Sequence, residues 1–290
     1  QESDVNAVTY SLFGLQVPFA PDFESTVDQF EQNFLATQTS GFSAALNAEK
    51  LYMAQKDASV FNLLSAASFR YLDGIGAVWA ARRKYNLPFA RVPGVELWLQ
   101  IAKRAARRGL KIAIIGGTEE TCQKAVEVLR EQHGIDVAYA RNGYFDSSER
   151  ATIAQALKAH DIRFAVIAMG SPRQEKFSQD MIEAGVNAFF FGVGGSLDVL
   201  TGKVDRAPRI FRDNGLEWLH RLLRQPNMHG TAVVINEFGA VGLDHDLVDH
   251  TNEHMVLLAN GCICCTVRGD LVEAFERLAQ SPQAQSGELR

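Results

Sequence analysis

A carboxylate in a glycine-rich turn is the first candidate for chemistry. Asp73 lies in Leu72-Asp73-Gly74-Ile75-Gly76, between a short apolar run and a stretch that predicts a helix starting near Val78. The glycines let a substrate approach the backbone closely, and a carboxylate placed there can accept a proton from an attacking hydroxyl. The same pattern is typical of a turn aspartate that caps a helix. Asp73 is therefore a candidate general base, with helix capping as the alternative.

Two glycine segments suit phosphate binding. Gly116 and Gly117 follow the apolar run Lys111–Ile115, and Gly194 lies in a glycine-rich segment after the apolar run Ala188–Phe191. Backbone amides and a helix N-terminus at such places bind anions. Neither segment has the G-x-G-x-x-G or G-x-x-x-x-G-K-[ST] pattern of dinucleotide or triphosphate sites, so each signal is weak by itself.

A further polar segment, Gly170–Glu175, follows the predicted strand Arg163–Met169. Pro172 suits the first position of a helix, and Ser171 suits its N-cap. Capping does not explain the next two residues. Arg173 can bind two diphosphate oxygens at once through its guanidinium group, and Gln174 can form hydrogen bonds with hydroxyls or amides.

Basic residues gather from about residue 203, in an otherwise acidic chain. In the predicted helix Gly215–Gln225 the leucines share one face, whereas Arg221 and Arg224 lie on another. One interpretation is a solvated surface helix. The other is an interfacial helix that touches anionic lipid headgroups or clamps a diphosphate.

Three cysteines near the C-terminus are spaced too tightly for a disulfide framework. Cys262, Cys264 and Cys265 favour metal or redox chemistry in a reducing, cytoplasmic setting. They could hold Zn²⁺, with His245 or His254 completing four ligands. The alternative is a set of reduced cysteines on a poorly packed fragment.

The elements that must position these residues alternate between apolar runs and amphipathic stretches. Such alternation predicts an α/β fold, a Rossmann-like parallel sheet flanked by helices, with ligands beyond the carboxyl ends of the strands. The expected strands are Gly41–Leu46, a short one ending at Asp73, Lys111–Ile115, Ile135–Tyr139, Arg163–Met169 and Asn187–Val193. The expected helices start at Ala48 or cover Val60–Phe69, Leu97–Arg108, Thr118–Gln132, Ser147–His160 and Pro172–Ala184.

Single residues mark the ends of these helices. Gly109 and Gly134 suit left-handed stops, and Thr118 or Ser148 can cap the helix that follows. Cys122 shares a helical face with apolar residues, which indicates a core position.

Composition limits the function classes. With 290 residues, 47% of them hydrophobic, and a net charge of −5, the chain can bury a sizeable core and offers no broad basic face for nucleic acid. No run reaches the roughly 20 apolar residues of a spanning helix.

The motifs, taken in order over about residues 8–227, resemble the WecG/TagA/CpsF family of glycosyltransferases. They are Asn47-Ala48-Glu49, Asp73-Gly74-Ile75-Gly76, Arg91-Val92-Pro93-Gly94, Ile115-Gly116-Gly117, Asn142-Gly143-Tyr144-Phe145, Gly170-Ser171-Pro172-Arg173-Gln174-Glu175, Gly192-Val193-Gly194-Gly195-Ser196-Leu197-Asp198, Gly202, Arg206-Ala207-Pro208 and Gly215-Leu216-Glu217-Trp218-Leu219-His220-Arg221.

The resemblance implies an inverting transfer of a sugar from a UDP donor to an undecaprenyl-diphosphate-linked acceptor, at the cytoplasmic face of the plasma membrane. The sugar is of the N-acetylmannosamine type, or glucose or a uronic acid in some members. The resemblance implies Asp73 as the base, a pocket lined by Asn47, Arg91 and Gln174, and a role for Arg206, Arg221 and Arg224. The other predicted substrate-binding residues are Gly116, Gly117, Arg173, Glu175, Gly194 and Asp198.

In the family the arginine-rich segment closes over the site and meets the membrane, and members can form homo-oligomers. No metal is required, because arginines and helix N-termini can neutralise the leaving diphosphate. One departure is Ala45, where family members commonly carry a threonine two positions before the asparagine.

The C-terminal part, about residues 228–280, resembles the CobW family of P-loop GTPases and metallochaperones. The resemblance rests on the apolar run Ala232–Ile235 with the following Asn236–Val248 and on Asn260–Leu271, which holds the Cys-x-Cys-Cys motif. Residues 205–230 lack a phosphate-binding loop, which argues against GTP hydrolysis.

The predicted organisation is a glycosyltransferase core at 1–202, an arginine-rich appendage for the membrane and active site at 203–227, a CobW-like α/β fragment at 228–280 and a polar tail, expected to be disordered, at 281–290. The alternatives to a transferase are a metal-binding CobW-like fragment and an inactive chimera.

Overall fold

The computed structural model describes residues 8–204, 235–236 and 257–258. The chain divides into two compact units, Gln1–Pro208 and Arg209–Arg290. In the second unit β9 (Ile235–Asn236) and β10 (Leu257–Leu258) form a short parallel pair. Arg206, Arg221, Arg224 and the three clustered cysteines, Cys262, Cys264 and Cys265, lie outside the described residues.

The first unit is built on a six-stranded parallel sheet, as predicted, with the strand order β4-β3-β8-β7-β5-β6. Its strands are β3 (Gly41–Leu46), β4 (Phe69–Leu72), β5 (Lys111–Gly116), β6 (Val137–Arg141), β7 (Ile162–Ala168) and β8 (Phe189–Gly192).

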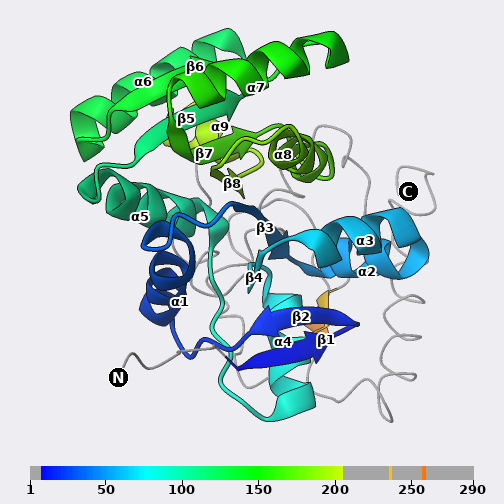
Figure 1. The fold of residues 1–290 in the computed structure, drawn as a ribbon. Coiled ribbons are helices and arrows are strands. Elements are labelled where there is room, and N and C mark those ends of the chain that lie inside the picture. The colour runs from blue at the N-terminus through cyan, green and yellow to red at the C-terminus, as the bar shows by residue number, and fades with distance from the viewer. Residues whose placement is uncertain (1–7, 205–234, 237–256, 259–290) are drawn as a thin grey trace, which may run out of the picture. The chain divides into compact units, whose positions relative to one another are not determined.

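Alternate residues of the strands face two apolar clusters, one on each side of the sheet. Ile112 and Ile114 pack into one cluster, and Ala113 and Ile115 pack into the other. A parallel sheet covered on both faces has such apolar strands. The first cluster includes buried residues of α1 (Phe23–Phe30), α5 (Gly94–Arg107), α6 (Glu119–His133) and α9 (Ser196–Leu200). The second includes those of α2 (Ala48–Lys56), α3 (Ala58–Ala66), α4 (Ile75–Tyr85), α7 (Arg150–Ala159) and α8 (Arg173–Glu183). Figure 1 shows α1 and α5 on one side of β3 and β8, and α2, α3 and α8 on the other.

The order of the strands sets the place of the site. The chain leaves β5 toward β6 on one side and leaves β7 toward β8 on the other, so the winding reverses between β5 and β7. Ligands of open α/β sheets bind at such a reversal, beyond the carboxyl ends of the strands. Because all six strands are parallel, the loops that carry Asn47, Asp73, Gly116, Gly170 and Gly194 lie along that same edge.

The N-terminal region contains elements that the sequence pattern did not predict. β1 (Thr9–Leu12) and β2 (Leu15–Pro18) form an antiparallel hairpin, whose turn places Phe13 and Gly14 at φ of 51° and 85°. α1 continues into the π-helix η1 (Glu31–Leu35). Strands of four residues leave too short an alternation to recognise. The helix predicted across Val60–Phe69 ends at Ala66, because Phe69–Leu72 pairs with β3 instead.

The helix ends confirm some predictions and correct others. Gly109 and Gly134 have φ of 71° and 64°, and Thr118 accepts a hydrogen bond from the amide of Thr121 as the cap of α6. Ser148 was wrong as a cap. Instead, Asp146 and Glu149 form a capping box around the short 3₁₀ helix η2 (Ser147–Glu149).

The cap predicted at Ser171 was also wrong. α8 begins at Arg173, one residue later than expected, and no side chain caps it. Pro172 has ψ of 3° and flanks the helix rather than opening it.

Across the part of the chain that the structure describes, no helix is both long and apolar enough to cross a bilayer.

Candidate active site

Asp73 follows β4 directly and is held at two points. Its amide donates to the carbonyl of Leu46 at 3.0 Å, and its carboxylate oxygen Oδ1 accepts from the amide of Gly94 at 3.0 Å. Gly94 is the first residue of α5, so Asp73 does bind a helix N-terminus, although not that of α4, which follows it in the chain. No described residue donates a hydrogen bond to Oδ2. One carboxylate oxygen is therefore structural, and the other can accept a proton.

Arg91 lies against the same turn. Its Nε donates to the carbonyl of Asp73 at 3.3 Å, and the amide of Val92 donates to the carbonyl of Leu72 at 2.8 Å. The predicted arginine and the predicted base are thus neighbours, although 18 residues separate them in the chain.

Asn47 lies on the other side of the Asp73 turn. A Cβ atom added to Gly74 would lie 3.0 Å from the Cβ of Asn47, so the loops after β3 and β4 touch. The side-chain oxygen of Asn47 caps α2 by accepting from the amide of Lys50 at 2.8 Å. Close packing at Gly74 places Asn47 beside the base.

Gln174 joins α8 to the loop after β8. Its Oε1 accepts from the amide of Gly194 at 2.9 Å, and its side chain is buried against Gly192. A Cβ at Gly192 would lie only 2.6 Å from Gln174 Nε2, so no larger residue fits there without a shift. The structure therefore uses the oxygen of this side chain to hold the backbone of the neighbouring loop.

Glu175 forms an ion pair that sequence reasoning missed. Its side chain is 1% exposed, and its Oε1 lies 2.8 Å from the ammonium of Lys50 and 3.4 Å from Gln174 Nε2. In the sequence, Lys50 resembles an ordinary surface lysine in the first turn of α2. No local pattern of residues indicates that it pairs with a buried carboxylate. Only the packing of α8 on β3 brings the two charges together.

Tyr71 is a second residue that the sequence did not single out. It is buried in β4, and a Cβ at Gly94 would lie 2.7 Å from its hydroxyl oxygen. Burial raises its pKa well above the usual value, and the carboxylates of Asp73 and Glu175 raise it further. The Tyr71 hydroxyl is therefore protonated at neutral pH and lies near both acidic groups. In the sequence, Tyr71 cannot be distinguished from any other aromatic residue of the core.

Gly116, the last residue of β5, and the following Gly117 are packed tightly against β7. The amide of Gly117 donates to the carbonyl of Ala168 at 3.0 Å, and the amide of Gly143 donates to the carbonyl of Gly117 at 2.9 Å. A Cβ at Gly116 would lie 2.2 Å from the Ala168 carbonyl oxygen. These glycines allow the ends of β5, β6 and β7 to approach one another. The Gly117 amide stabilises this arrangement by its hydrogen bond to Ala168.

An open groove of about 350 Å³ lies beside this junction, lined by Tyr144, Phe145, Asp146, Glu149 and Arg173. The Arg173 guanidinium donates to the Gly143 carbonyl at 2.7 Å and lies 6.0 Å from the centre of the Phe145 ring. The Tyr144 side chain is 72% exposed. The groove thus offers an exposed aromatic ring and a fixed arginine.

Asp198 contacts α6 through its side chain. Its Oδ1 accepts from the Thr121 hydroxyl at 3.3 Å and lies 3.8 Å from the Lys203 ammonium.

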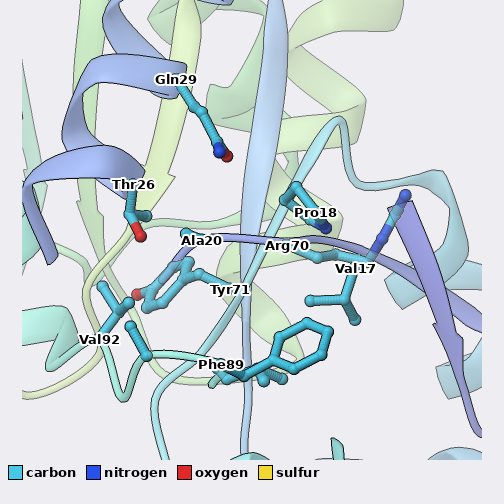
Figure 2. A pocket seen from close by; sticks show the side chains of 11 residues that line it. Val17, Pro18, Ala20, Thr26, Gln29, Arg70, Tyr71, Phe89 and Val92 are labelled. Carbon is cyan, nitrogen blue, oxygen red and sulfur yellow. The ribbon is translucent and has the colours of Figure 1, made fainter. Parts of the chain in front are cut away.

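A separate cavity lies between β2, α1 and β4, with Gln29, Thr26 and Tyr71 on its wall (Figure 2). Its volume is about 10 Å³, enough for a single water. Gln29 Oε1 is buried there without a hydrogen-bond partner among the described side chains, and a water would satisfy it. The cavity is too small for a sugar.

The first turn of α8 connects the two halves of the edge. Arg173 contacts the β5–β6 side, whereas Gln174 and Glu175 contact the β3–β8 side.

In residues 8–204 no three His, Cys, Asp or Glu side chains gather as they would around a metal ion.

Comparison with known protein families adds two matches. The model described as the glycosyl transferase WecG/TagA/CpsF family matches residues 11–241. The model described as the CobW/HypB/UreG nucleotide-binding domain matches residues 217–287. The two matches overlap around residue 228, where the sequence motifs change from one resemblance to the other.

Proposed function

This chain belongs to the WecG/TagA/CpsF family of glycosyltransferases, and from that premise we propose that it moves a sugar from a UDP-sugar to a polyprenyl-diphosphate-linked acceptor. The family supports a role in the synthesis of cell-surface polysaccharide. The donor is proposed to carry an N-acetylmannosamine-type sugar, glucose or a uronic acid.

The proposed base is Asp73. The acceptor hydroxyl oxygen attacks the anomeric carbon, the bond from that carbon to the UDP oxygen breaks, and the hydroxyl proton passes to Asp73 Oδ2. UDP leaves with the bonding electrons, and the configuration at the anomeric carbon inverts. The observation that carries this proposal is that the two carboxylate oxygens differ: Oδ1 accepts a hydrogen bond from Gly94, whereas Oδ2 has no hydrogen bond within the described region.

The groove beside Arg173 is proposed to take the UDP moiety. The exposed ring of Tyr144 can stack on a uracil base, and Arg173 can bind diphosphate oxygens. Arginines and helix N-termini can neutralise the leaving diphosphate without a metal ion. Arg206, Arg221 and Arg224 are proposed to assist there.

The basic segment 203–227 is proposed to bring the protein to the cytoplasmic face of the plasma membrane as a peripheral protein. Clustered lysines and arginines are attracted to anionic lipid. Self-association into a homo-oligomer is a further proposal.

The test is release of UDP from a panel of UDP-sugars with a soluble lipid-diphosphate-sugar acceptor. Asp73→Asn should lower kcat by about 10²–10⁴-fold, because general-base catalysis contributes that much. The fold should be retained in far-UV circular dichroism. Asp180→Asn is the matched control, because it removes a carboxylate of α8 that pairs with Arg150 and to which no role in the site is assigned. A folded Asp73→Asn protein with near-normal turnover would refute the assignment.

A second candidate function is metal binding by the CobW-like part. It rests on the match to residues 217–287 and on Cys262, Cys264 and Cys265, which could bind Zn²⁺. Zinc content of full-length and truncated chains separates this candidate from the first.

A further inference from the structure

Glu175 is a buried carboxylate that is only half satisfied. Its Oε1 binds Lys50 at 2.8 Å and receives a longer contact from Gln174 Nε2. Its Oε2 is also buried, and the described part of the chain offers it no hydrogen-bond donor. Proteins rarely leave a buried charged oxygen unpaired, because the desolvation cost is large.

The side chain of Glu175 and the proposed base lie at the same end of the sheet. The carboxylates of Asp73 and Glu175 both act electrostatically on the buried hydroxyl of Tyr71. Lys50 is in the first turn of α2, which Asn47 caps, and Asn47 touches the Asp73 turn at Gly74. Glu175 therefore belongs to the same end of the sheet as Asp73.

The charge of the surroundings limits what Oε2 can bind. A phosphate would be repelled by the carboxylate itself. A metal cation on Oε2 would share the carboxylate with the Lys50 ammonium, which lies 2.8 Å from Oε1. The two positive charges would repel each other. A neutral donor, such as a hydroxyl or an amide N–H, carries neither penalty.

We propose that Glu175 is a specificity-determining residue, whose Oε2 accepts a hydrogen bond from one hydroxyl or N-acetyl N–H group of a bound pyranose, while Lys50 is the positioning residue that holds Oε1. The inference rests on the proposed glycosyl transfer. It adds a hydrogen bond that recognises the sugar and that is distinct from the contact with the base. The sugar is either that of the donor or that of the acceptor.

The experiment compares parent sugars with analogues that lack one donor group each. One series consists of UDP-monodeoxysugars, and the other consists of soluble lipid-diphosphate acceptors with one deoxygenated position. The wild type should prefer the parent by about 10- to 100-fold in kcat/KM at one position, as expected for a hydrogen bond to a charged group. The series that contains this position identifies the sugar that Glu175 reads.

Glu175→Gln should weaken the preference at that position alone. The Lys50 ammonium needs an acceptor, so the amide oxygen takes the place of Oε1 and the NH₂ group replaces Oε2. An N-acetyl N–H then faces a donor, and a sugar hydroxyl can only exchange its bond to a charged oxygen for a weaker neutral one, so the preference for the parent sugar should fall several-fold. Preferences at the other positions should stay as in the wild type, which a merely structural defect would not produce.

Two lysine variants test the positioning role. Lys50→Arg keeps a cation on Oε1 and should preserve the preference, whereas Lys50→Met should lose it. Asp180→Asn, on the same helix, is the control and should leave every ratio unchanged. If Glu175→Gln is poorly folded, the charge-neutral Lys50→Met/Glu175→Gln pair replaces it.

The outcomes separate the two proposals. Turnover by the wild type with the full preference retained in Glu175→Gln overturns this inference and leaves the proposed function standing. A wild type that neither binds nor turns over any sugar in the panel overturns both.

Discussion

Single atoms decide what each polar residue at the sheet edge can do. Asp73 and Glu175 each have one oxygen engaged by the protein and one without a donor in the described ranges. Gln174 differs, because its oxygen holds the Gly194 amide. The two carboxylates therefore remain able to accept protons or hydrogen bonds from a ligand, and Gln174 serves chiefly to fix a loop.

Burial likewise decides the chemistry of Cys122. Its side chain is buried in the core, as the sequence predicted, and burial raises the pKa of its thiol from 9.0 to about 11, with a smaller contribution from Glu119. Between about pH 9 and pH 11 the unfolded chain loses this proton and the folded chain keeps it. The free energy of unfolding should therefore fall as pH rises through this window.

The measurement compares the wild type with Cys122→Ala by urea unfolding at about pH 8 and about pH 10. The stability of the wild type relative to the variant should decline with pH. In a background with serine at 262, 264 and 265, the folded protein should also resist a thiol reagent at pH 8. Modification as fast as in the denatured chain would contradict the burial of Cys122.

At the scale of elements, close backbone approach holds the strand ends together. Gly116 ends β5 at φ of 143°, and an added Cβ would meet the Ala168 carbonyl of β7 at 2.2 Å. The obstacle is backbone within a paired strand, so it cannot rotate away. The close parallel pairing of β5 and β7 at Gly116 and Ala168 thus depends on the absence of a side chain.

Gly116→Ala should lower the free energy of unfolding by more than about 2 kcal/mol, because it adds a clash to the cost of a positive φ. Gly109→Ala is the matched control, since Gly109 has φ of 71° but open space around it. Gly109→Ala should lower the free energy of unfolding by only about 1 kcal/mol. Equal losses in urea unfolding would show that the contact with Ala168 is unimportant.

At the scale of the whole molecule, the first unit contains the parallel sheet and both apolar clusters. All the buried residues described in these clusters lie between Leu12 and Leu197, inside Gln1–Pro208. The CobW-like match begins only at residue 217. Folding of the transferase core should therefore not need the C-terminal part.

A chain ending at Asn227 should unfold at the same temperature as the full chain and release UDP at a similar rate. It keeps the basic segment 203–227 and loses the three cysteines. Zinc retained by the full chain and absent from the shorter one would support the metal-binding candidate. A truncated chain that fails to fold would show that residues 228–290 stabilise the core.

The amino-acid sequence by itself determined the α/β class, the parallel sheet and the loops that carry the candidate residues. These follow from local patterns, since apolar runs, helical periodicity and stops such as Gly134 involve neighbours in the chain. The sequence also sufficed for the family, because its motifs recur in order. It did not determine the hairpin at Phe13 or helix α1, whose short or irregular patterns resemble loops.

Only the tertiary structure decided which atoms at the site are free and which are used. Lys50 and Glu175 lie 125 residues apart in the chain, and they meet because β3 lies beside β8 and α8 packs on β3. The same packing buries Tyr71 near Asp73 and binds Gln174 to Gly194. Such contacts depend on strand order and on the volume that distant side chains fill, which no local pattern of residues encodes.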